Sequence, residues 1–448
     1  MREVFDRASV GFLAVIAERQ ALCPSTDALK LQSSDFAMPH RFAALPWESS
    51  MPTPVVFRGQ IVFPNRIERG ALVVRAGRIA EVLDDDATLL EFTNVIDAGD
   101  GYLSPGFVDL HVHGGLGGDF MDGTSESFQL ALKAHARHGT TRMAITTTVA
   151  KHEQILATLQ LTRQFRHTPE PNGARVMGAH FYGPYFRYEA RGAHPGAEVR
   201  PAIPQEFDQY LEYADDLVTA TVAPEIIGAK EFALACRAKG VRTNVGHSWA
   251  TFAQMTEAVE WGVRHIDHLF CAMSDKTRLR QFQMYPMQGG VLEATLYYDE
   301  LTTEVIADGK HLDASLLLLA LKIKGPDRLA LVTDCSRALD MPNGNYVIGP
   351  RDGGEPFVKQ DDVGMLPDLT ALASSVQGMD YMIRTFAKLT GRPLWEVIRM
   401  ASLTPARIAG RDREFGSLEK GKQADVVVFD RDLNVQRVFV DGVELQLK

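Results

Sequence analysis

The stretch Leu103–Gly115, which reads LSPGFVDLHVHGG, decides the fold that the sequence predicts. It combines a turn, a short apolar strand, two alternate histidines and the start of a glycine-rich loop. Successive side chains of a strand point to opposite faces, so His111 and His113 point the same way. Two imidazoles on one face at the end of a strand can hold one metal ion. The stretch therefore predicts a metal-binding strand that leaves room for a substrate beside the glycines.

Strand-like and helix-like segments alternate through the middle of the chain, as in a parallel sheet with crossover helices. The predicted strands are Phe107–Val112, Arg142–Val149, Arg175–Phe181, Leu217–Val222, Arg242–Val245, Arg264–Leu269, Val291–Tyr298 and Arg328–Thr333. Helical patterns lie between most of them, for example over 126–138, 152–165, 230–239, 252–261 and 314–323, and two more follow the last strand, over 378–389 and 394–402. Eight such units predict a closed (β/α)8 barrel of the TIM type, so the predicted fold class is α/β.

Short β-rich runs punctuated by turn residues lie on both sides of this middle segment, over 54–98 and again over 424–440. Two β-rich ends around one long α/β segment predict a small β-sandwich built from both ends of the chain. We therefore divide the chain into three parts. They are an appended N-terminal arm of low order (1–50), the β-sandwich (51–102 and 412–448) and the barrel (103–411).

Composition and charge argue against several classes of function. Of the 448 residues, 45% are hydrophobic and 23% are charged, as in ordinary globular proteins. The formal net charge is −10 and the Lys and Arg residues are scattered, which argues against nucleic-acid binding. No apolar run reaches about 18 residues, so we expect no membrane-spanning segment. Four cysteines without a CxxC pair predict a reducing, cytoplasmic location.

Histidines and carboxylates occur at the ends of several predicted strands, where the active-site residues of such barrels gather. Besides His111 and His113, they include His247, His268 and Asp334. A single histidine at a strand end is usually structural, but this many at matching ends predicts a site. Imidazoles and a carboxylate bind divalent ions such as Zn²⁺, and such an ion lowers the pKa of a bound water to about 7. We expect Asp334 to accept that proton and pass it to the leaving group.

Further motifs give the chain a specific resemblance to a known family. They are Pro105–Gly114, Thr221–Glu225, Gly246–Ser248, His268–Met273, Ile306–His311, Leu331–Asp334, Ala401–Ala406 and Gly416–Asp425. In these motifs the chain resembles the amidohydrolase superfamily, and within it the N-acetylglucosamine-6-phosphate deacetylase family. The resemblance implies a metal-dependent amide hydrolase that removes acetyl from an N-acetylated amino sugar. The implied reaction converts N-acetylglucosamine 6-phosphate to glucosamine 6-phosphate and acetate, in a homodimer.

The resemblance also implies roles for individual residues. His247 and His268 match metal ligands, Asp334 matches the catalytic aspartate, and His194 matches the histidine that polarises the amide carbonyl. The positions that match substrate contacts are His311, Cys271, Ala272 and Ser374. The family also uses an arginine from the neighbouring subunit to bind the phosphate, and the nearest candidates here are Arg278 and Arg280.

One metal-ligand position departs from the family. After the third strand the family has a glutamate, whereas this chain has Tyr182 within His180–Pro184. A neutral phenol, with a pKa of about 10, is a poor ligand beside a carboxylate. We therefore expect one divalent ion per chain, and we place Tyr182 on the substrate side of the site.

Two positions for this ion remain open on sequence grounds. The ion can lie with His111, His113, His247 and Asp334, or it can lie with His247, His268 and water. The first arrangement is preferred because it gives His111 and His113 a role.

The tyrosine also leaves two other functions open. A one-metal site suits other amidohydrolase reactions, such as deamination or hydrolysis of a cyclic amide. Loss of the glutamate also suits a metal-free paralogue that binds sugar phosphates. A comparison of acetate release with ammonia release separates the two enzymes, and elemental analysis separates a metalloenzyme from a metal-free binder.

Overall fold

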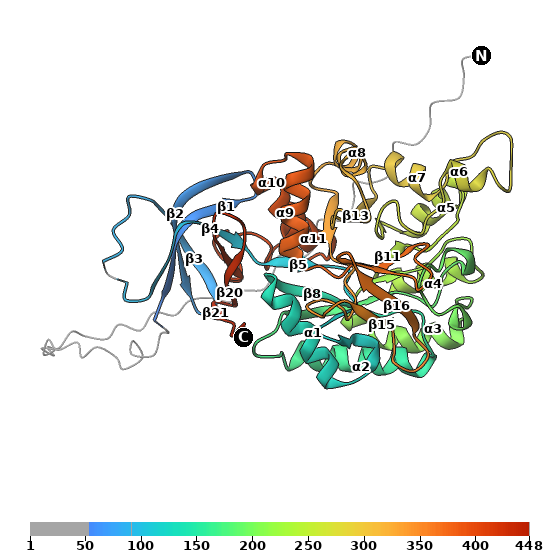
Figure 1. The fold of residues 1–448 in the computed structure, drawn as a ribbon, viewed down its shortest axis with the longest axis horizontal. Coiled ribbons are helices and arrows are strands. Elements are labelled where there is room, and N and C mark those ends of the chain that lie inside the picture. Colours follow the sequence, from blue (N-terminus) through green and yellow to red (C-terminus); the bar gives the residue numbers. More distant parts are fainter. Residues whose placement is uncertain (1–52, 91, 448) are drawn as a thin grey trace, which may run out of the picture. The chain divides into compact units, whose positions relative to one another are not determined.

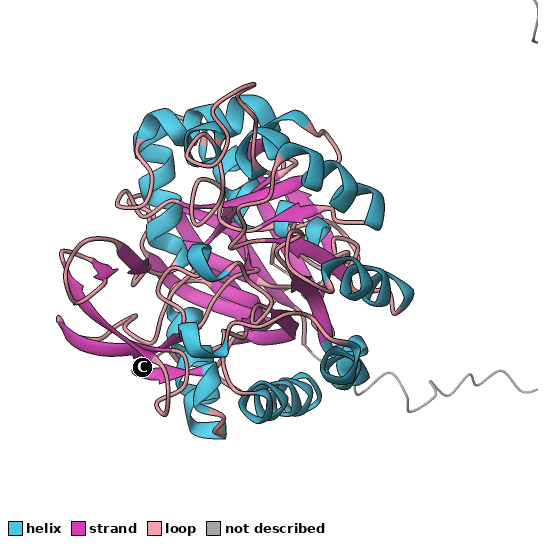
Figure 2. Ribbon diagram, turned by 90° about the vertical axis from the view of Figure 1, so that its right-hand side faces the viewer, coloured by secondary structure: helices cyan, strands magenta, loops and turns pink. Residues whose placement is uncertain are grey.

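The computed structural model describes residues 53–90 and 92–447, so the arm predicted over 1–50 lies outside the described residues. An eight-stranded parallel sheet has the order β14-β13-β12-β11-β10-β9-β8-β5. Its strands are β5 (Phe107–Asp109), β8 (Thr140–Thr146), β9 (Arg175–Phe181), β10 (Leu217–Thr221), β11 (Arg242–Val245), β12 (His265–Ile266), β13 (Thr302–Ile306) and β14 (Leu329–Val332). Helices surround these strands (Figure 2), which confirms the predicted barrel.

The two edge strands of this sheet, β5 and β14, meet at the stretch that carries the alternate histidines. The amide of Asp334 donates a hydrogen bond to the carbonyl of His111 at 2.8 Å, and the amide of His113 donates to the carbonyl of Cys335 at 2.9 Å. The contact that completes the barrel is therefore made by the backbone of three predicted site residues. Their relative positions are fixed by the fold rather than by loop conformation.

Helices cover the outside of the barrel. Those that match the predicted helical patterns are α1 (Ser125–Arg137), α2 (His152–His167), α4 (Ala229–Ala238), α5 (Phe252–Trp261), α8 (Ala314–Lys324), α9 (Met379–Thr390) and α10 (Leu394–Ala401). The others are α3 (Pro204–Tyr210), α6 (Lys276–Leu279), α7 (Val291–Tyr297) and α11 (Leu403–Ile408). In helix α1 the hydroxyl of Thr124 accepts from the amide of Ser127 and caps the N-terminus. Within the described ranges, no helix is both long and apolar enough to cross a membrane.

The seventh barrel strand lies later in the chain than the sequence pattern predicts. The segment predicted as a strand over Val291–Tyr298 is helix α7, in which Glu293 accepts from the amide of Gly290 at 2.7 Å. The strand is β13 instead, and it contains the buried Glu304. A buried carboxylate inside a strand is rare, so β13 lacks the apolar run typical of a parallel strand. The prediction of this one strand is therefore wrong.

The β-rich ends of the chain form one seven-stranded sheet of the order β21-β20-β19-β4-β1-β2-β3. Its strands are β1 (Val55–Phe63), β2 (Arg66–Arg75), β3 (Arg78–Asp84), β4 (Val95–Pro105), β19 (Val426–Phe429), β20 (Val435–Val440) and β21 (Val443–Glu444). Blue N-terminal strands lie beside red C-terminal strands in Figure 1, and β4 pairs with β19. Phe57 and Phe439 contact each other edge to face in its core. The predicted β-sandwich from both ends is confirmed.

A small antiparallel sheet lies late in the barrel segment, between β14 and α9. Its strands are β15 (Gly344–Ile348), β16 (Glu355–Gln360), β17 (Val363–Met365) and β18 (Leu372–Ser374). A two-stranded ribbon of β6 (Gly114–Gly115) and β7 (Gly118–Asp119) follows the histidine pair. Arg337 is held against this ribbon by Asp122, with two hydrogen bonds of 3.0 Å.

Candidate active site

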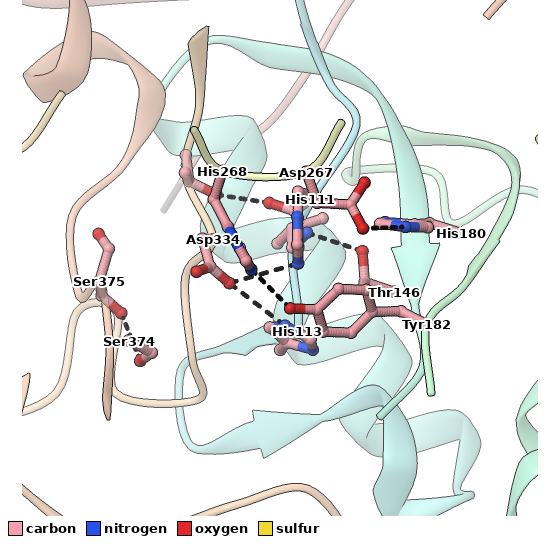
Figure 3. A network of polar contacts seen from close by, with 12 residues as sticks. His111, His113, Thr146, His180, Tyr182, Asp267, His268, Asp334, Ser374 and Ser375 are labelled. Carbon is pink, nitrogen blue, oxygen red and sulfur yellow. Dashed lines mark hydrogen bonds and ion pairs between the residues drawn. The ribbon is translucent and has the colours of Figure 1, made fainter. Parts of the chain in front are cut away.

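A pocket of about 580 Å³ lies where the C-terminal ends of the barrel strands meet. Most of the residues that the sequence predicts for the site line it. They are His113, Tyr182, His194, His247, His268, Cys271, Ala272, Arg278, His311 and Asp334. The close view in Figure 3 shows His111, His113, Tyr182, His268 and Asp334 turned toward one another.

Three predicted residues lie outside the lining of this pocket. His111 is fully buried and lies directly behind Asp334 and His113, so it belongs to the site without facing the pocket. Ser374 is also buried, and its hydroxyl donates to the carbonyl of Ser375 at 2.9 Å. Arg280 does not line the pocket, unlike Arg278. The structure therefore does not bring Ser374 and Arg280 to the substrate side of the site.

The backbone is strained where the strand ends present the site residues. His247, His268 and Asp334 have positive φ values of 46°, 21° and 46°. Such a conformation is uncommon for residues other than glycine and persists where the surrounding structure enforces it. Each of the three lies two residues beyond the end of a barrel strand and lines the pocket, so the strained backbone lies at the barrel mouth.

His111, His268 and Asp334 form the group that best fits a metal ion. Each offers one ligand atom, and these atoms lie within 4.8 Å of one another. Nε2 of His113 lies 3.2 Å from Oδ1 of Asp334. Nε2 of His111 is buried, lies 3.5 Å from the same oxygen and has no hydrogen-bond partner among the described residues. Imidazole nitrogens and one carboxylate form a donor set that a divalent ion accepts.

The charges in this group are matched to a cation. Burial opposes a proton on His111, but the carboxylates of Asp334 and Glu304 outweigh it and raise the pKa of His111 to about 9. Burial also opposes ionisation of Asp334, but His111 and His113 hold its pKa well below the ordinary value. A positive charge is therefore stabilised between these residues, and a bound metal ion would replace the extra proton of His111.

His247 lies beside this group, with its ring centre 5.1 Å from that of His268. Nδ1 of its ring lies 2.7 Å from the carbonyl of Ala190, and Phe186 stacks on it with ring centres 4.4 Å apart. Burial, followed by the nearby imidazole of His194, keeps the pKa of His247 well below its usual value. A neutral ring that donates from Nδ1 carries its lone pair on Nε2. His247 is thus a candidate ligand at the pocket wall, whereas His268 is the one grouped with His111 and Asp334.

Tyr182 makes a hydrogen bond that the sequence does not reveal. Its hydroxyl lies 2.7 Å from Nε2 of His268 (Figure 3). Burial and the charge of Asp334 raise the pKa of Tyr182 well above 10, so the phenol stays neutral. Burial, followed by the charge on His111, lowers the pKa of His268 to about 4, so its ring is neutral as well. Tyr182 therefore donates to Nε2 of His268, and an ion at this nitrogen would have to displace that hydrogen bond.

The pocket lining also carries a guanidinium and an imidazole whose protonation a nearby carboxylate favours. Nδ1 of His311 lies 2.7 Å from Asp308, and this carboxylate outweighs burial and raises the pKa of His311. The guanidinium of Arg278 lies over the ring of Trp249, 4.8 Å from its centre. Cys271 lines the same pocket, and burial raises the pKa of its thiol to about 12. This lining therefore presents a guanidinium, an imidazole that Asp308 helps to protonate, and one neutral thiol.

Glu304 is the site residue that sequence reasoning misses. Its Oε1 lies 2.6 Å from Nδ1 of His111, and its Oε2 lies 3.2 Å from Nε2 of His265. Burial opposes ionisation of Glu304, but these two histidines hold its pKa well below the ordinary value. The available signal was a carboxylate inside the β-branched run Thr302–Ile306, although it lies two residues before the end of that run and not beyond it.

Comparison with known proteins agrees with this architecture. The amidohydrolase family pattern matches residues 102–445. An N-acetylglucosamine-6-phosphate deacetylase from Rattus norvegicus is 32% identical over 394 residues, which cover 84% of this chain and 91% of that protein. An N-acetylgalactosamine-6-phosphate deacetylase from Escherichia coli O157:H7 is 33% identical over 341 residues, with coverage of 76% and 86%.

A solved structure gives the same result. It is a variant of N-acetyl-D-glucosamine-6-phosphate deacetylase from Mycobacterium smegmatis, in complex with N-acetyl-D-glucosamine-6-phosphate. It superimposes with a TM-score of 0.79 at 27% identity, and the match covers 88% of this chain and 100% of that one. On the family pattern, the sequence relatives and the shared fold, this chain belongs to the amidohydrolase family.

Proposed function

We propose that this chain is a metal-dependent hydrolase that removes acetyl from an N-acetylated amino sugar 6-phosphate, with N-acetylglucosamine 6-phosphate as its substrate. The observation that carries the proposal is the convergence of His111, His268 and Asp334 at the floor of a pocket that His194 and His311 also line. The names of the relatives support this substrate class, because both describe deacetylases of amino sugar 6-phosphates.

The proposed chemistry uses groups that the structure brings together. His111, His268 and Asp334 would hold a divalent ion, which would supply a Lewis acid and lower the pKa of a water to about 7. Asp334 is ionised, so it can accept a proton from the attacking water and deliver it to the leaving amine. Burial, followed by the charge of His113, keeps the pKa of His194 well below its usual value.

A neutral His194 can stabilise the developing oxyanion. The hydroxyl of Thr148 contacts its Nδ1. When Thr148 donates this hydrogen bond, the proton of the imidazole is on Nε2, which can then donate to the acetyl oxygen. Cleavage of the amide bond releases acetate and the free amine of the sugar.

We assign the phosphate of the substrate to the part of the pocket lining that contains Arg278 and His311. Arg278 and His311 both line the pocket, and a guanidinium together with a protonated imidazole would bind a dianion. Ala272 and Cys271 belong to the same lining, and the small side chain of Ala272 leaves space for the sugar. Arg278 belongs to this chain, so the structure offers a phosphate contact within one subunit as well as the cross-subunit contact that the family resemblance implies.

The identity of the ion, the oligomeric state and the location are also proposals. We propose zinc, one ion per chain, because the grouped ligands are two imidazoles and one carboxylate. A homodimer is supported by four apolar side chains exposed on one loop near the pocket, which are Phe282, Met284, Tyr285 and Met287. A cytoplasmic location is supported by Cys236, Cys271 and Cys335, which are free thiols.

The test is an acetate-release assay on the full chain with a defined metal content. N-acetylglucosamine 6-phosphate, N-acetylgalactosamine 6-phosphate and unphosphorylated N-acetylglucosamine are compared at equal concentration. The 6-phosphates should release acetate, chelation should stop the release, and added zinc should restore it. Ammonia release from amino-substituted substrates without acetate release would favour the other amidohydrolase reactions. Metal-free protein that still binds the sugar phosphates after purification would favour the non-catalytic paralogue.

A further inference from the structure

Two groups of histidines and carboxylates lie in contact inside the barrel. The first is His111, His268 and Asp334, described above. The second is His265, Asp267 and Glu304, and each of these residues is at most 1% exposed. They are joined by the contact of 2.6 Å between Nδ1 of His111 and Oε1 of Glu304. The role of the second group is thus tied to the site.

The second group is a closed hydrogen-bond network rather than a second metal site. Oδ2 of Asp267 accepts from the hydroxyl of Thr221 at 2.6 Å, and its Oδ1 accepts from the side-chain amide of Asn244 at 2.9 Å. Both oxygens of Glu304 face histidine nitrogens. The carboxylate oxygens are therefore already used, and a cation would have to break bonds that satisfy buried groups.

We propose that Glu304 is a positioning residue that sets His111 for metal binding. This proposal rests on the proposed metal-dependent function. A carboxylate at 2.6 Å can only accept, so Nδ1 of His111 donates to it. In a metal-bound, neutral imidazole the lone pair is then on Nε2, the nitrogen 3.5 Å from Asp334 that has no hydrogen-bond partner. A carboxylate behind a ligand histidine fixes both its tautomer and its ring orientation.

The surroundings of Glu304 hold it rigidly enough for this role. Its backbone carbonyl accepts from the amide of Leu269 at 2.8 Å, and β13 pairs with both β12 and β14. Its second oxygen faces His265, whose Nδ1 lies 2.8 Å from the hydroxyl of Thr302. Oε1 also accepts from the backbone amide of His268 at 3.3 Å. One carboxylate therefore contacts two residues of the metal group and is itself held from behind.

The test compares Glu304→Gln with Asp267→Asn. Each change keeps the size and hydrogen-bonding atoms of a buried carboxyl group in the second network, but only Glu304 contacts His111. Zinc affinity of the metal-stripped full chain is measured by competition with a chelator, and the thermal midpoint of the metal-free protein is recorded beside it. We expect Glu304→Gln to weaken zinc binding about 10–100-fold, and Asp267→Asn to change it less than about twofold.

Two results would overturn the proposal. One is wild-type zinc affinity in Glu304→Gln, and the other is an equal loss in both variants, which would indicate a general disturbance of the buried network. If Glu304→Gln does not fold, ¹⁵N-histidine NMR of the zinc-loaded wild-type protein decides the question. The signal that disappears in His111→Asn should show a protonated Nδ1 and a zinc-bound Nε2, and zinc on Nδ1 would refute the role. These measurements do not use acetate release, so the proposed substrate can fail independently.

Discussion

Replacement of Asp334 by asparagine should abolish acetate release and leave the barrel folded. The fold should survive because the structural contacts of this position are made by its backbone. Its amide donates to His111 at 2.8 Å, and its carbonyl accepts from the amide of Ser375 at 3.1 Å. Its φ of 46° also tolerates asparagine, because Asn and Asp are enriched in the left-handed region.

The loss of activity follows from the side chain. Oδ1 of Asp334 lies 3.2 Å from Nε2 of His113 and 3.5 Å from Nε2 of His111, and these rings keep the carboxyl group ionised. Asparagine has the same shape, but it cannot accept a proton and brings no charge to the ion. Loss of a general base costs about 10²–10⁴-fold in rate, or about 3–5 kcal/mol of transition-state stabilisation. Weaker metal binding adds to this loss.

The assay is kcat for acetate release at saturating zinc, with the thermal midpoint measured on the same preparation. Asp109→Asn is the matched control, because Asp109 is buried at the same barrel contact and its carboxylate accepts from Thr333 at 2.6 Å, away from the pocket. Asp334→Asn should lose at least a hundredfold in kcat, whereas the control should stay within about tenfold of the wild type. A folded Asp334→Asn variant with kcat near that of the wild type would refute the role of Asp334 as the base.

Three further changes test other parts of the structure. Tyr182→Phe leaves Nε2 of His268 without its donor, which should cost the metal-free protein about 1–3 kcal/mol of stability. Zinc should therefore raise the thermal midpoint more in this variant than in the wild type. An equal rise would contradict the hydrogen bond. Asp380 and Asp340 lie 2.9 and 3.0 Å from the two ring nitrogens of His138, and together they outweigh burial and raise its pKa to about 9. These two contacts stabilise the folded state by about 3 kcal/mol below pH 6.5, and this stabilisation is lost as the pH rises through 9. A pH series of unfolding free energies should show the loss in the wild type and lack it in His138→Gln. Arg142→Met leaves the buried Asp425 unpaired and should cost about 3–5 kcal/mol in denaturant unfolding, with part of the loss restored by adding Asp425→Asn.

Local patterns in the sequence were sufficient to predict the barrel and most of its pocket. His111 and His113 alternate along a strand, and His247, His268 and Asp334 each follow one, so the rule of strand ends places them together without knowledge of the tertiary contacts. Side-chain orientation is a different matter. Ser374 lies in a segment that borders the pocket, yet its hydroxyl donates to the backbone carbonyl of Ser375. No periodicity in the sequence encodes that rotation.

The contacts that sequence reasoning misses join residues far apart in the chain. His111 and Glu304 are separated by 193 positions, and Tyr182 and His268 by 86. Such pairs exist only after the barrel closes. Glu304 also makes its own strand hard to predict, because a buried carboxylate breaks the apolar pattern. The residue that obscures the seventh strand is thus the residue that supports the site.

These two long-range contacts together bear on the number of ions that the site can hold. Within the described residues, the carboxylates that contact the imidazoles of the grouped ligands are Asp334 and Glu304. Two negative charges balance one divalent cation in a buried site, whereas a second cation would need a further anion to offset the cost of its desolvation. Tyr182 cannot supply that anion, because its phenol is neutral and its proton is engaged with His268. The charges of the site therefore support the proposal of one ion per chain.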